Sequence, residues 1–320
     1  NDPSDASTSS RRPRRFLPSI RLLVALIVVV PAALVAVSLV TIATVTSRGI
    51  AERLGQEIVD SATARVSSDV RDYLANAVRL SDLYVRRLND GFLKTDDLRT
   101  WEQLMFRDLG ANPGVASICF STPNADCTWL LYAHGRLELG LVDGNRRDQA
   151  VEYPATPDGK VDRTTPIRVY HYDATARPWY KLAVETNRSI WTPAYFWFGE
   201  AGHDSETGIG YTRPVRDHDG NLLGVLVIDV TLSALSEHLK QLPIATNGYA
   251  FIVDDQGKLI AASDGPVNSA KGERLAPGDS ESPAARSIAD LMRDPATTAP
   301  VSGTWDQFDP PQSHRVFVNG

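Results

Sequence analysis

The sequence predicts an α+β fold in which one transmembrane helix leads into a long helix that carries two lobes with antiparallel sheets. Three observations predict this architecture. Residues 22–45 are uncharged, residues 47–89 repeat apolar positions at helical spacing, and strand patterns dominate the rest of the chain. Two later segments, 215–230 and 251–262, share the order apolar strand, acidic turn with glycine, apolar strand. This weak internal repeat indicates two lobes of related design, joined near residue 243.

The first predicted element is a membrane anchor. Residues 22–45 contain no charge over 24 positions, and a helix needs about 20 apolar residues to span a bilayer. A secretory signal peptide is the rival interpretation, but its apolar core is usually only about 7–15 residues long. Five arginines lie within residues 11–21, and the positive-inside rule therefore places the N-terminus in the cytoplasm.

This orientation predicts a receptor of a bacterial inner membrane, with a single visible span and both lobes in the periplasm. The sequence stops in a strand pattern that runs into a turn, so we expect the second lobe to be truncated. A complete receptor would continue after Gly320 with a cytoplasmic output domain, such as a kinase or cyclase. The predicted parts are a cytoplasmic tail (1–21), a transmembrane helix (22–45), a spine helix (46–90), a membrane-distal, ligand-binding lobe (91–242) and a membrane-proximal lobe (243–320).

Residues 47–89 predict one unbroken helix. No proline interrupts it, and charged residues separate its apolar positions. At about 1.5 Å per residue it is roughly 60 Å long, which is typical of a spine that carries lobes away from a membrane. We expect two chains to pair along it as a homodimer. The apolar positions are Leu54, Ile58, Ala62, Val66, Val70, Leu74, Val78 and Tyr84.

The remaining chain combines short helices with strands. Helices are expected over residues 95–109 and 233–242, and period-two patterns predict strands elsewhere. Two hairpins are expected, with turns at residues 218–220 and 256–257. The expected strands are residues 115–120, 128–133, 136–142, 211–217, 221–230, 247–255 and 258–263.

Composition and motifs exclude several classes of function. The formal net charge is −6, without long like-charge blocks, whereas nucleic-acid binding needs a basic face. The six histidines are scattered and no zinc-binding spacing occurs, so no metal site is expected. Neither a dinucleotide loop nor a nucleophile elbow appears, so we expect no cofactor and no catalysis within these residues.

The two cysteines, Cys119 and Cys127, flank a turn-rich stretch between two strand patterns. In an oxidising compartment this placement suits a disulfide across a hairpin. Two separate thiols are the alternative, and the sequence leaves both open.

The strongest functional signal is one arginine among four aromatic residues in the stretch 170–182. Arg177 offers a planar guanidinium group, which can bind a carboxylate through a bidentate contact. Asp229 follows the apolar stretch 224–228, where a charge is costly unless something pairs with it. The two residues either serve a small ligand that carries both charges or pair with each other as a structural contact. The aromatic residues are Tyr170, Tyr172, Trp179 and Tyr180.

Three pieces of sequence, taken in order after a long juxtamembrane helix, resemble a known family. They are RPWYKLA at 177–183, WTPAYFWFG at 191–199 and GVLVIDVTLSALSEHL at 224–239. The region 47–320 thereby resembles the double-Cache sensor domain of bacterial transmembrane receptors. The resemblance implies two PAS-like lobes on a long helix, with a ligand in the membrane-distal lobe.

One subgroup of that family, which binds free amino acids, is similar in further detail. The resemblance implies that Tyr172, Arg177 and Trp179 hold the ligand's carboxylate, and that Tyr180, Tyr195 and Asp229 hold its ammonium group. Residues 199–208 depart from the subgroup and look like an extra loop. An amine, a carboxylate or a purine is an alternative ligand, and a ligand-free structural or adhesive ectodomain is an alternative function.

Overall fold

The computed structural model describes residues 20–133, 135–142, 149–197, 206–244, 249–270, 272–286, 289, 302–305 and 314–319. Residues 1–19 of the predicted cytoplasmic tail therefore lie outside the described residues. The chain divides into two compact units, residues 1–56 and 57–320.

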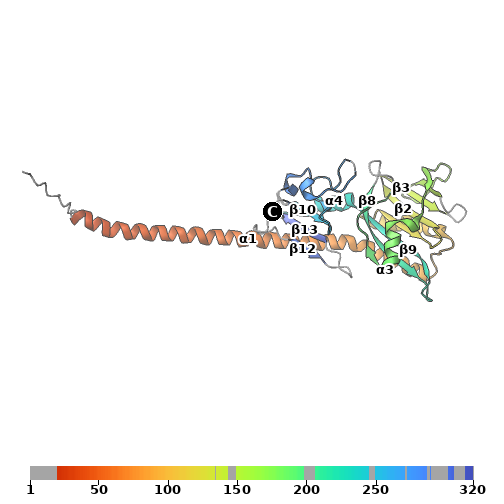
Figure 1. Ribbon diagram of the computed structural model, residues 1–320, viewed down its shortest axis with the longest axis horizontal. Coiled ribbons are helices and arrows are strands. Elements are labelled where there is room, and N and C mark those ends of the chain that lie inside the picture. Colours follow the sequence, from red (N-terminus) through yellow and green to blue (C-terminus); the bar gives the residue numbers. More distant parts are fainter. Residues whose placement is uncertain are drawn as a thin grey trace, which may run out of the picture. The chain divides into compact units, whose positions relative to one another are not determined.

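Helix α1 (Ile20–Asn89) supplies the described residues of the first unit, 20–56, and the first residues of the second (Figure 1). Within the described residues, one stretch is long and apolar enough to cross a membrane, Ile27–Ile50. It overlaps the predicted span at 22–45, and its apolar side chains, such as Ile27 and Val40, are exposed. The expected long N-terminal helix is confirmed. Pro31 lies inside it, as membrane helices tolerate.

In the second unit, α1 buries one stripe of side chains in the main hydrophobic core. The stripe advances by three or four residues, because 3.6 residues complete a helical turn. It comprises Ala62, Val66, Val70, Leu74, Ala77, Leu80 and Tyr84, each at most 8% exposed. A short 3₁₀ turn (Leu98–Trp101) and helix α2 (Glu102–Ala111) follow. The helix expected at 95–109 starts later because the Asp97 side chain caps the turn at Arg99 N.

A large antiparallel sheet forms the body of this unit, with the strand order β5-β4-β3-β2-β1-β9-β8-β6 and β7 paired to β8 (Figure 1). The predicted hairpin at 218–220 is confirmed as the turn between β8 and β9, where Asp217 N donates to Asn221 O. The strands are β1 (Ser117–Ser121), β2 (Cys127–Ala133), β3 (Arg136–Val142), β4 (Gln149–Ala155), β5 (Arg168–His171), β6 (Ile190–Trp191), β7 (Tyr195–Phe196), β8 (Thr207–Arg216) and β9 (Leu222–Thr231).

Both faces of this sheet are covered, because alternate side chains of each central strand enter different cores. Ile118 and Ile228 belong to the core that includes α1 and α2. Cys119 and Val227, one residue along each strand, belong to a second core that includes helix α3 (Pro178–Thr186). The candidate site lies on this second face.

A smaller antiparallel sheet has the strand order β11-β10-β13-β12. Its strands are β10 (Tyr249–Val253), β11 (Leu259–Ala262), β12 (Ser302–Trp305) and β13 (His314–Asn319). Helix α4 (Leu232–Gln241) packs against β11 and against β8 and β9 of the large sheet. The expected α+β class with antiparallel sheets is confirmed.

Candidate functional site

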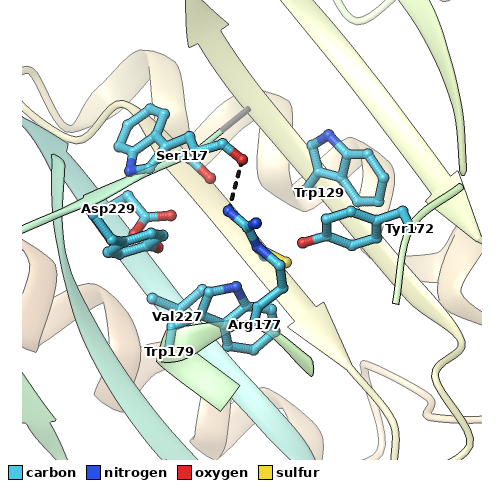
Figure 2. A pocket seen from close by; sticks show the side chains of 10 residues that line it. Ser117, Trp129, Tyr172, Arg177, Trp179, Val227 and Asp229 are labelled. Atoms are coloured by element: carbon cyan, nitrogen blue, oxygen red, sulfur yellow. Dashed lines mark hydrogen bonds between the residues drawn. The ribbon is translucent and has the colours of Figure 1, made fainter. Parts of the chain in front are cut away.

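A small cavity lies on the α3 face of the large sheet, where β1 and β9 run side by side (Figure 2). Its volume is about 30 Å³, room for about two water molecules. Five of the six sequence-predicted site residues line it, although they come from three stretches that lie apart in the chain. The lining residues are Ser117, Cys119, Trp129, Tyr172, Arg177, Trp179, Tyr195, Trp197, Val227 and Asp229.

Arg177 reaches this cavity because of the proline that follows it. Pro178 occupies the first position of α3 and restricts the preceding residue to extended backbone, which Arg177 adopts at φ −73° and ψ 148°. Its Nη2 atom donates to the carbonyl oxygens of Phe196, at 2.6 Å, and Trp197, at 2.9 Å. The guanidinium carbon also lies 5.9 Å from the centre of the Tyr172 ring. Within the described chain, the buried Nε atom has no hydrogen-bond partner.

Asp229 lies at the other side of the cavity and is only 4% exposed. The Tyr195 hydroxyl donates to its Oδ1 atom over 2.7 Å. Burial raises the pKa of Asp229 to about 7, and hydrogen bonds from Tyr195 and Ser117 and the charge of Arg177 oppose that rise. Among the described ion pairs none joins Arg177 to Asp229. The cavity thus holds a cation and a titratable carboxyl group that each use other partners.

The sequence-based interpretation places Tyr180 at the ligand, whereas the structure places it outside the cavity lining. Trp179 and Tyr180 are adjacent in α3, so their side chains cannot face the same point. Tyr180 packs edge-on against Trp179, with ring centres 5.7 Å apart. Burial raises its pKa, with Asp173 as a further cause. Tyr180 therefore contacts Trp179 and does not line the cavity.

Two tryptophans that the sequence interpretation missed complete the aromatic walls. Trp129 lies on β2 with its ring centre 5.1 Å from that of Tyr172, and Trp197 follows β7. Both are at most 5% exposed, and in the described part of the chain their Nε1 atoms have no hydrogen-bond partner. Trp197 lies in the quoted WTPAYFWFG stretch, but Trp129 is found only once the pairing of β1 with β2 is known.

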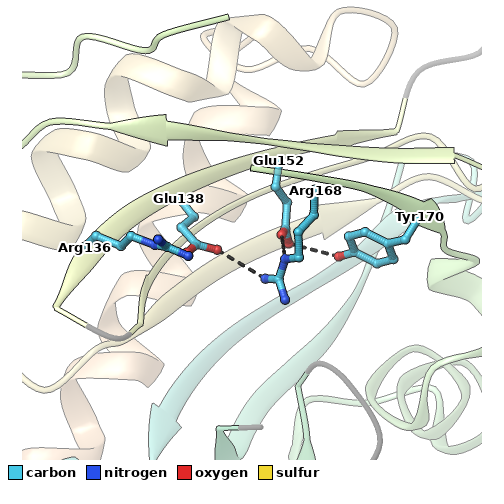
Figure 3. Close-up of polar contacts among 5 residues, drawn as sticks. All are labelled: Arg136, Glu138, Glu152, Arg168 and Tyr170. Carbon is cyan, nitrogen blue, oxygen red and sulfur yellow. Dashed lines mark hydrogen bonds and ion pairs between the residues drawn. The ribbon is translucent and has the colours of Figure 1, made fainter. Parts of the chain in front are cut away.

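An ion-pair network crosses the outer strands β3, β4 and β5 of the large sheet (Figure 3). Glu138 and Glu152 are at most 1% exposed. Arg168 donates to both, at 2.6 Å to Glu152 and 3.2 Å to Glu138, and Tyr170 donates to Glu152 at 2.9 Å. Burial raises the pKa of Glu152, and Arg168 opposes that rise. Tyr170 packs edge-on against Tyr172, so the network supports the end of β5, which directly precedes Tyr172.

The two cysteines lie side by side under the cavity and are not bridged. Their Sγ atoms are 3.5 Å apart, and both side chains are buried. Burial raises the pKa of Cys119, with the hydrogen bond to Cys127 as the next cause. The cross-hairpin disulfide, which the sequence leaves open beside two separate thiols, remains a hypothesis.

The predicted extra loop at 199–208 lies outside the described residues as far as residue 205. Its last two residues are strand, because Thr207 and Gly208 pair with Phe196 and Tyr195 of β7. This end of the segment therefore belongs to the sheet that carries the site.

Comparison with known proteins agrees with this architecture. The sequence profile of the Cache domain family, in its double-Cache form, matches residues 46–290. The chain belongs to the Cache domain family. The profile covers the large sheet and the start of the small one, so this Cache domain includes every residue that lines the cavity.

Curated relatives of this Cache domain are chemotaxis receptors. The methyl-accepting chemotaxis protein McpC of Bacillus subtilis is 34% identical over 94 residues, which are 28% of this chain and 13% of McpC. McpG of Pseudomonas putida is 25% identical over 202 residues, which are 62% of this chain and 27% of McpG. The matches span no more than about a quarter of either receptor.

Solved structures of two Pseudomonas aeruginosa chemoreceptor domains share the fold. The ligand-binding domain of PctC, in complex with GABA, has a TM-score of 0.51 and 19% identity, covering 82% of this chain and 98% of its own. The ligand-binding domain of PctB, in complex with L-Arg, has a TM-score of 0.50 and 14% identity, covering 82% of this chain and 86% of its own.

Proposed function

We propose that this Cache domain is the ligand-sensing region of a membrane receptor and that it binds an amino acid in the cavity between Arg177 and Asp229. One observation carries the proposal: the cavity contains a cation and a carboxyl group of opposite charge that do not pair with each other. Their present partners are uncharged, and a zwitterionic amino acid would supply an oppositely charged partner for each. Arg177, Trp179 and Tyr172 would receive the carboxylate, and Asp229 and Tyr195 the ammonium group.

The interactions suit this assignment chemically. A guanidinium group binds a carboxylate through two parallel hydrogen bonds, and the Nε atom of Arg177 still lacks a partner within the described chain. An ammonium group favours a carboxylate together with hydroxyls and ring faces, and Asp229 lies beside the Tyr195 hydroxyl. The two chemoreceptor domains that share the fold are in complex with GABA and L-Arg, and these ligands carry both groups.

Binding would rearrange the site. A cavity of about 30 Å³ is smaller than an amino acid, so side chains must move to admit one. Arg177 is the first candidate, because its Nη2 atom holds the carbonyl groups of Phe196 and Trp197. A ligand carboxylate would compete for this guanidinium and thereby act on the end of β7. A ligand signals only by favouring one state over another, and this exchange of partners is such a difference.

A binding screen on the full chain in nanodiscs tests the function. The screen offers the standard amino acids and γ-aminobutyrate beside plain amines, monocarboxylates and purines, with thermal shift followed by calorimetry. We expect saturable binding of at least one amino acid. Binding confined to compounds that lack either the ammonium or the carboxylate group would overturn the assignment, and a chain that binds nothing would favour the adhesive alternative.

The proposed topology has the N-terminus in the cytoplasm, a single span and the lobes in the periplasm, with the parts bounded at residues 21, 45, 90 and 242. Alkaline phosphatase fused after residue 90 should be active, because it folds only outside the cytoplasm, and green fluorescent protein at the same position should be dark. The reverse pattern would contradict the orientation.

The proposed homodimer needs an apolar surface on α1 that its own chain leaves open. From Ala62 to Tyr84 the apolar stripe is buried within the chain, whereas Ile50, Leu54 and Ile58 are 54–58% exposed. We therefore expect single cysteines at Leu54 and Ile58 to crosslink between chains in membranes, and a cysteine at Asp60, which lies about 120° or more around the helix from both, to crosslink far less. Equal yields at all three positions would count against pairing through this stripe.

A further inference from the structure

Three groups that line the cavity each lie over a glycine at a neighbouring strand position. They are the rings of Trp129 and Trp197 and the carboxyl group of Asp229. A Cβ atom at Gly140 would come within 1.8 Å of the Trp129 ring, and one at Gly208 within 2.6 Å of the Trp197 ring. At Gly210 the same atom would lie 2.5 Å from Oδ1 of Asp229. Glycine in a strand interior costs stability and often marks the close approach of another group. These glycines are thus part of how the cavity is shaped.

Of these three glycines, Gly210 lies beneath the carboxyl group of Asp229. Strand pairing places Gly210, Asp229 and Ser117 in one row across β8, β9 and β1, and residues opposite each other in a sheet project from the same face. Asp229 therefore has a small hydroxyl on one side and open space on the other. Its carboxyl group occupies that space, where the Tyr195 hydroxyl, 3.4 Å from the Cβ position of residue 210, binds it.

The glycine is required for space and not for backbone conformation. Gly210 is absent from the glycines with positive φ, so alanine can adopt its backbone angles. The strand cannot retreat, because Gly210 N donates to Thr192 Oγ1 over 2.9 Å and Gly210 O accepts from Thr192 N over 2.8 Å. A methyl group must instead displace side-chain tips, namely Oδ1 of Asp229 and Cγ2 of Val227.

We propose that Gly210 is a specificity-determining position: by leaving room for the Asp229 carboxyl group against Tyr195, it creates the part of the cavity that accepts an ammonium group. This proposal rests on the proposed function, which assigns the ammonium group to Asp229. Gly210 acts through Asp229 and is a positioning residue. No atom of Arg177 is among the three nearest to the Cβ position of residue 210, so we expect the Arg177 side to be less affected.

The test is Gly210→Ala in the full chain in nanodiscs. L-alanine, L-glutamine and L-arginine are each compared with the carboxylic acid that lacks the α-ammonium group, which for L-alanine is propionate. Affinity for those amino acids that the parent binds should fall about tenfold or more, while affinity for the deaminated acids should stay within about threefold. Equal losses for both sets would show a general packing defect and overturn the proposal.

A second readout needs no ligand. The carboxyl carbon of Asp229, assigned in NMR spectra by its loss in Asp229→Asn, should titrate at a different midpoint in Gly210→Ala, because the Tyr195 hydroxyl no longer binds it in the same place. An unchanged midpoint would overturn the proposal about Gly210, whether or not the parent binds an amino acid. A parent chain that binds no amino acid would by itself refute only the proposed function.

Two further variants keep the test decisive. Gly110→Ala, in α2, places a methyl group with nothing within 4 Å and should change neither readout. If Gly210→Ala does not fold, the pair Val227→Ala and Val227→Ala/Gly210→Ala replaces it, because removing Cγ2 of Val227 makes room for the new methyl group. The second member of that pair should show the same selective loss relative to the first.

Discussion

Arg177→Ala should lose measurable binding of amino acids while the chain stays folded. Truncating one member of a buried, hydrogen-bonded charge pair typically costs about 2–5 kcal/mol of binding, which is roughly 30-fold or more in affinity. Arg177→Lys should also bind poorly, because an ammonium group cannot form the bidentate contact that a guanidinium group forms with a carboxylate. Calorimetry on the purified variants, beside their melting curves, provides the measurement.

Arg99 supplies the matched control for this substitution. It is an exposed arginine of the same unit, so Arg99→Ala should bind like the parent. A purely structural role of Arg177 makes a different forecast: melting temperature would fall sharply and affinity would survive in the folded fraction. A folded Arg177→Ala chain that binds as tightly as the parent would refute the assignment of this residue.

Asp229→Asn should separate ligands by charge. The amide keeps the size of the carboxyl group and can still accept from Tyr195, but it cannot balance an ammonium group. Amino acids and amines should therefore bind at least about tenfold more weakly, whereas plain carboxylates, which use the Arg177 side, should be little affected. Equal losses for all ligands would contradict the role of Asp229.

The same residue predicts how binding depends on pH. The groups that face Asp229 are Tyr195, Ser117 and Arg177, and its pKa lies at about 7 in the ligand-free protein. An ammonium group binds the ionised form, so affinity for amino acids should fall about tenfold per pH unit below pH 7 and level off above about pH 8. In Asp229→Asn this dependence should disappear, which titration calorimetry at several pH values can check.

Stability should change with pH in the opposite sense to affinity. Because the folded-state pKa of Asp229 is raised above its ordinary value of 3.8, the protonated group favours the fold, and its contribution to stability is lost as the pH rises toward 7. Asp229→Asn should therefore melt at a higher temperature than the parent at pH 8 and not at pH 4. A lower melting temperature at pH 8 would indicate that the ionised carboxylate stabilises the ligand-free fold.

Local sequence patterns predicted many of the elements, but not the strands β4 to β7 and β12 or the helix α3, and they did not predict how the strands meet. The spacing along α1 and the turns at Gly220 and Gly257 depend on neighbouring residues, so they could be recognised directly. Pro178 likewise restricts the backbone of the preceding residue, Arg177, to the extended conformation, which the sequence alone indicates. The place of Trp129 beside Tyr172 depends on the pairing of distant strands, which a period of two does not determine. Tyr180 was assigned to the ligand from its place in the family's motif. That place does not determine toward which side of α3 the side chain points.

The central claim is that opposite charges in one cavity bind the two charged groups of one amino acid. Its most direct test is calorimetry of the full chain with the tightest-binding amino acid, its N-acetyl derivative and its carboxamide. Acetylation removes the positive charge that Asp229 would receive, and amidation removes the negative charge that Arg177 would receive. We predict that each derivative binds roughly 30-fold more weakly or worse. A derivative that binds as tightly as the free amino acid would contradict the claim.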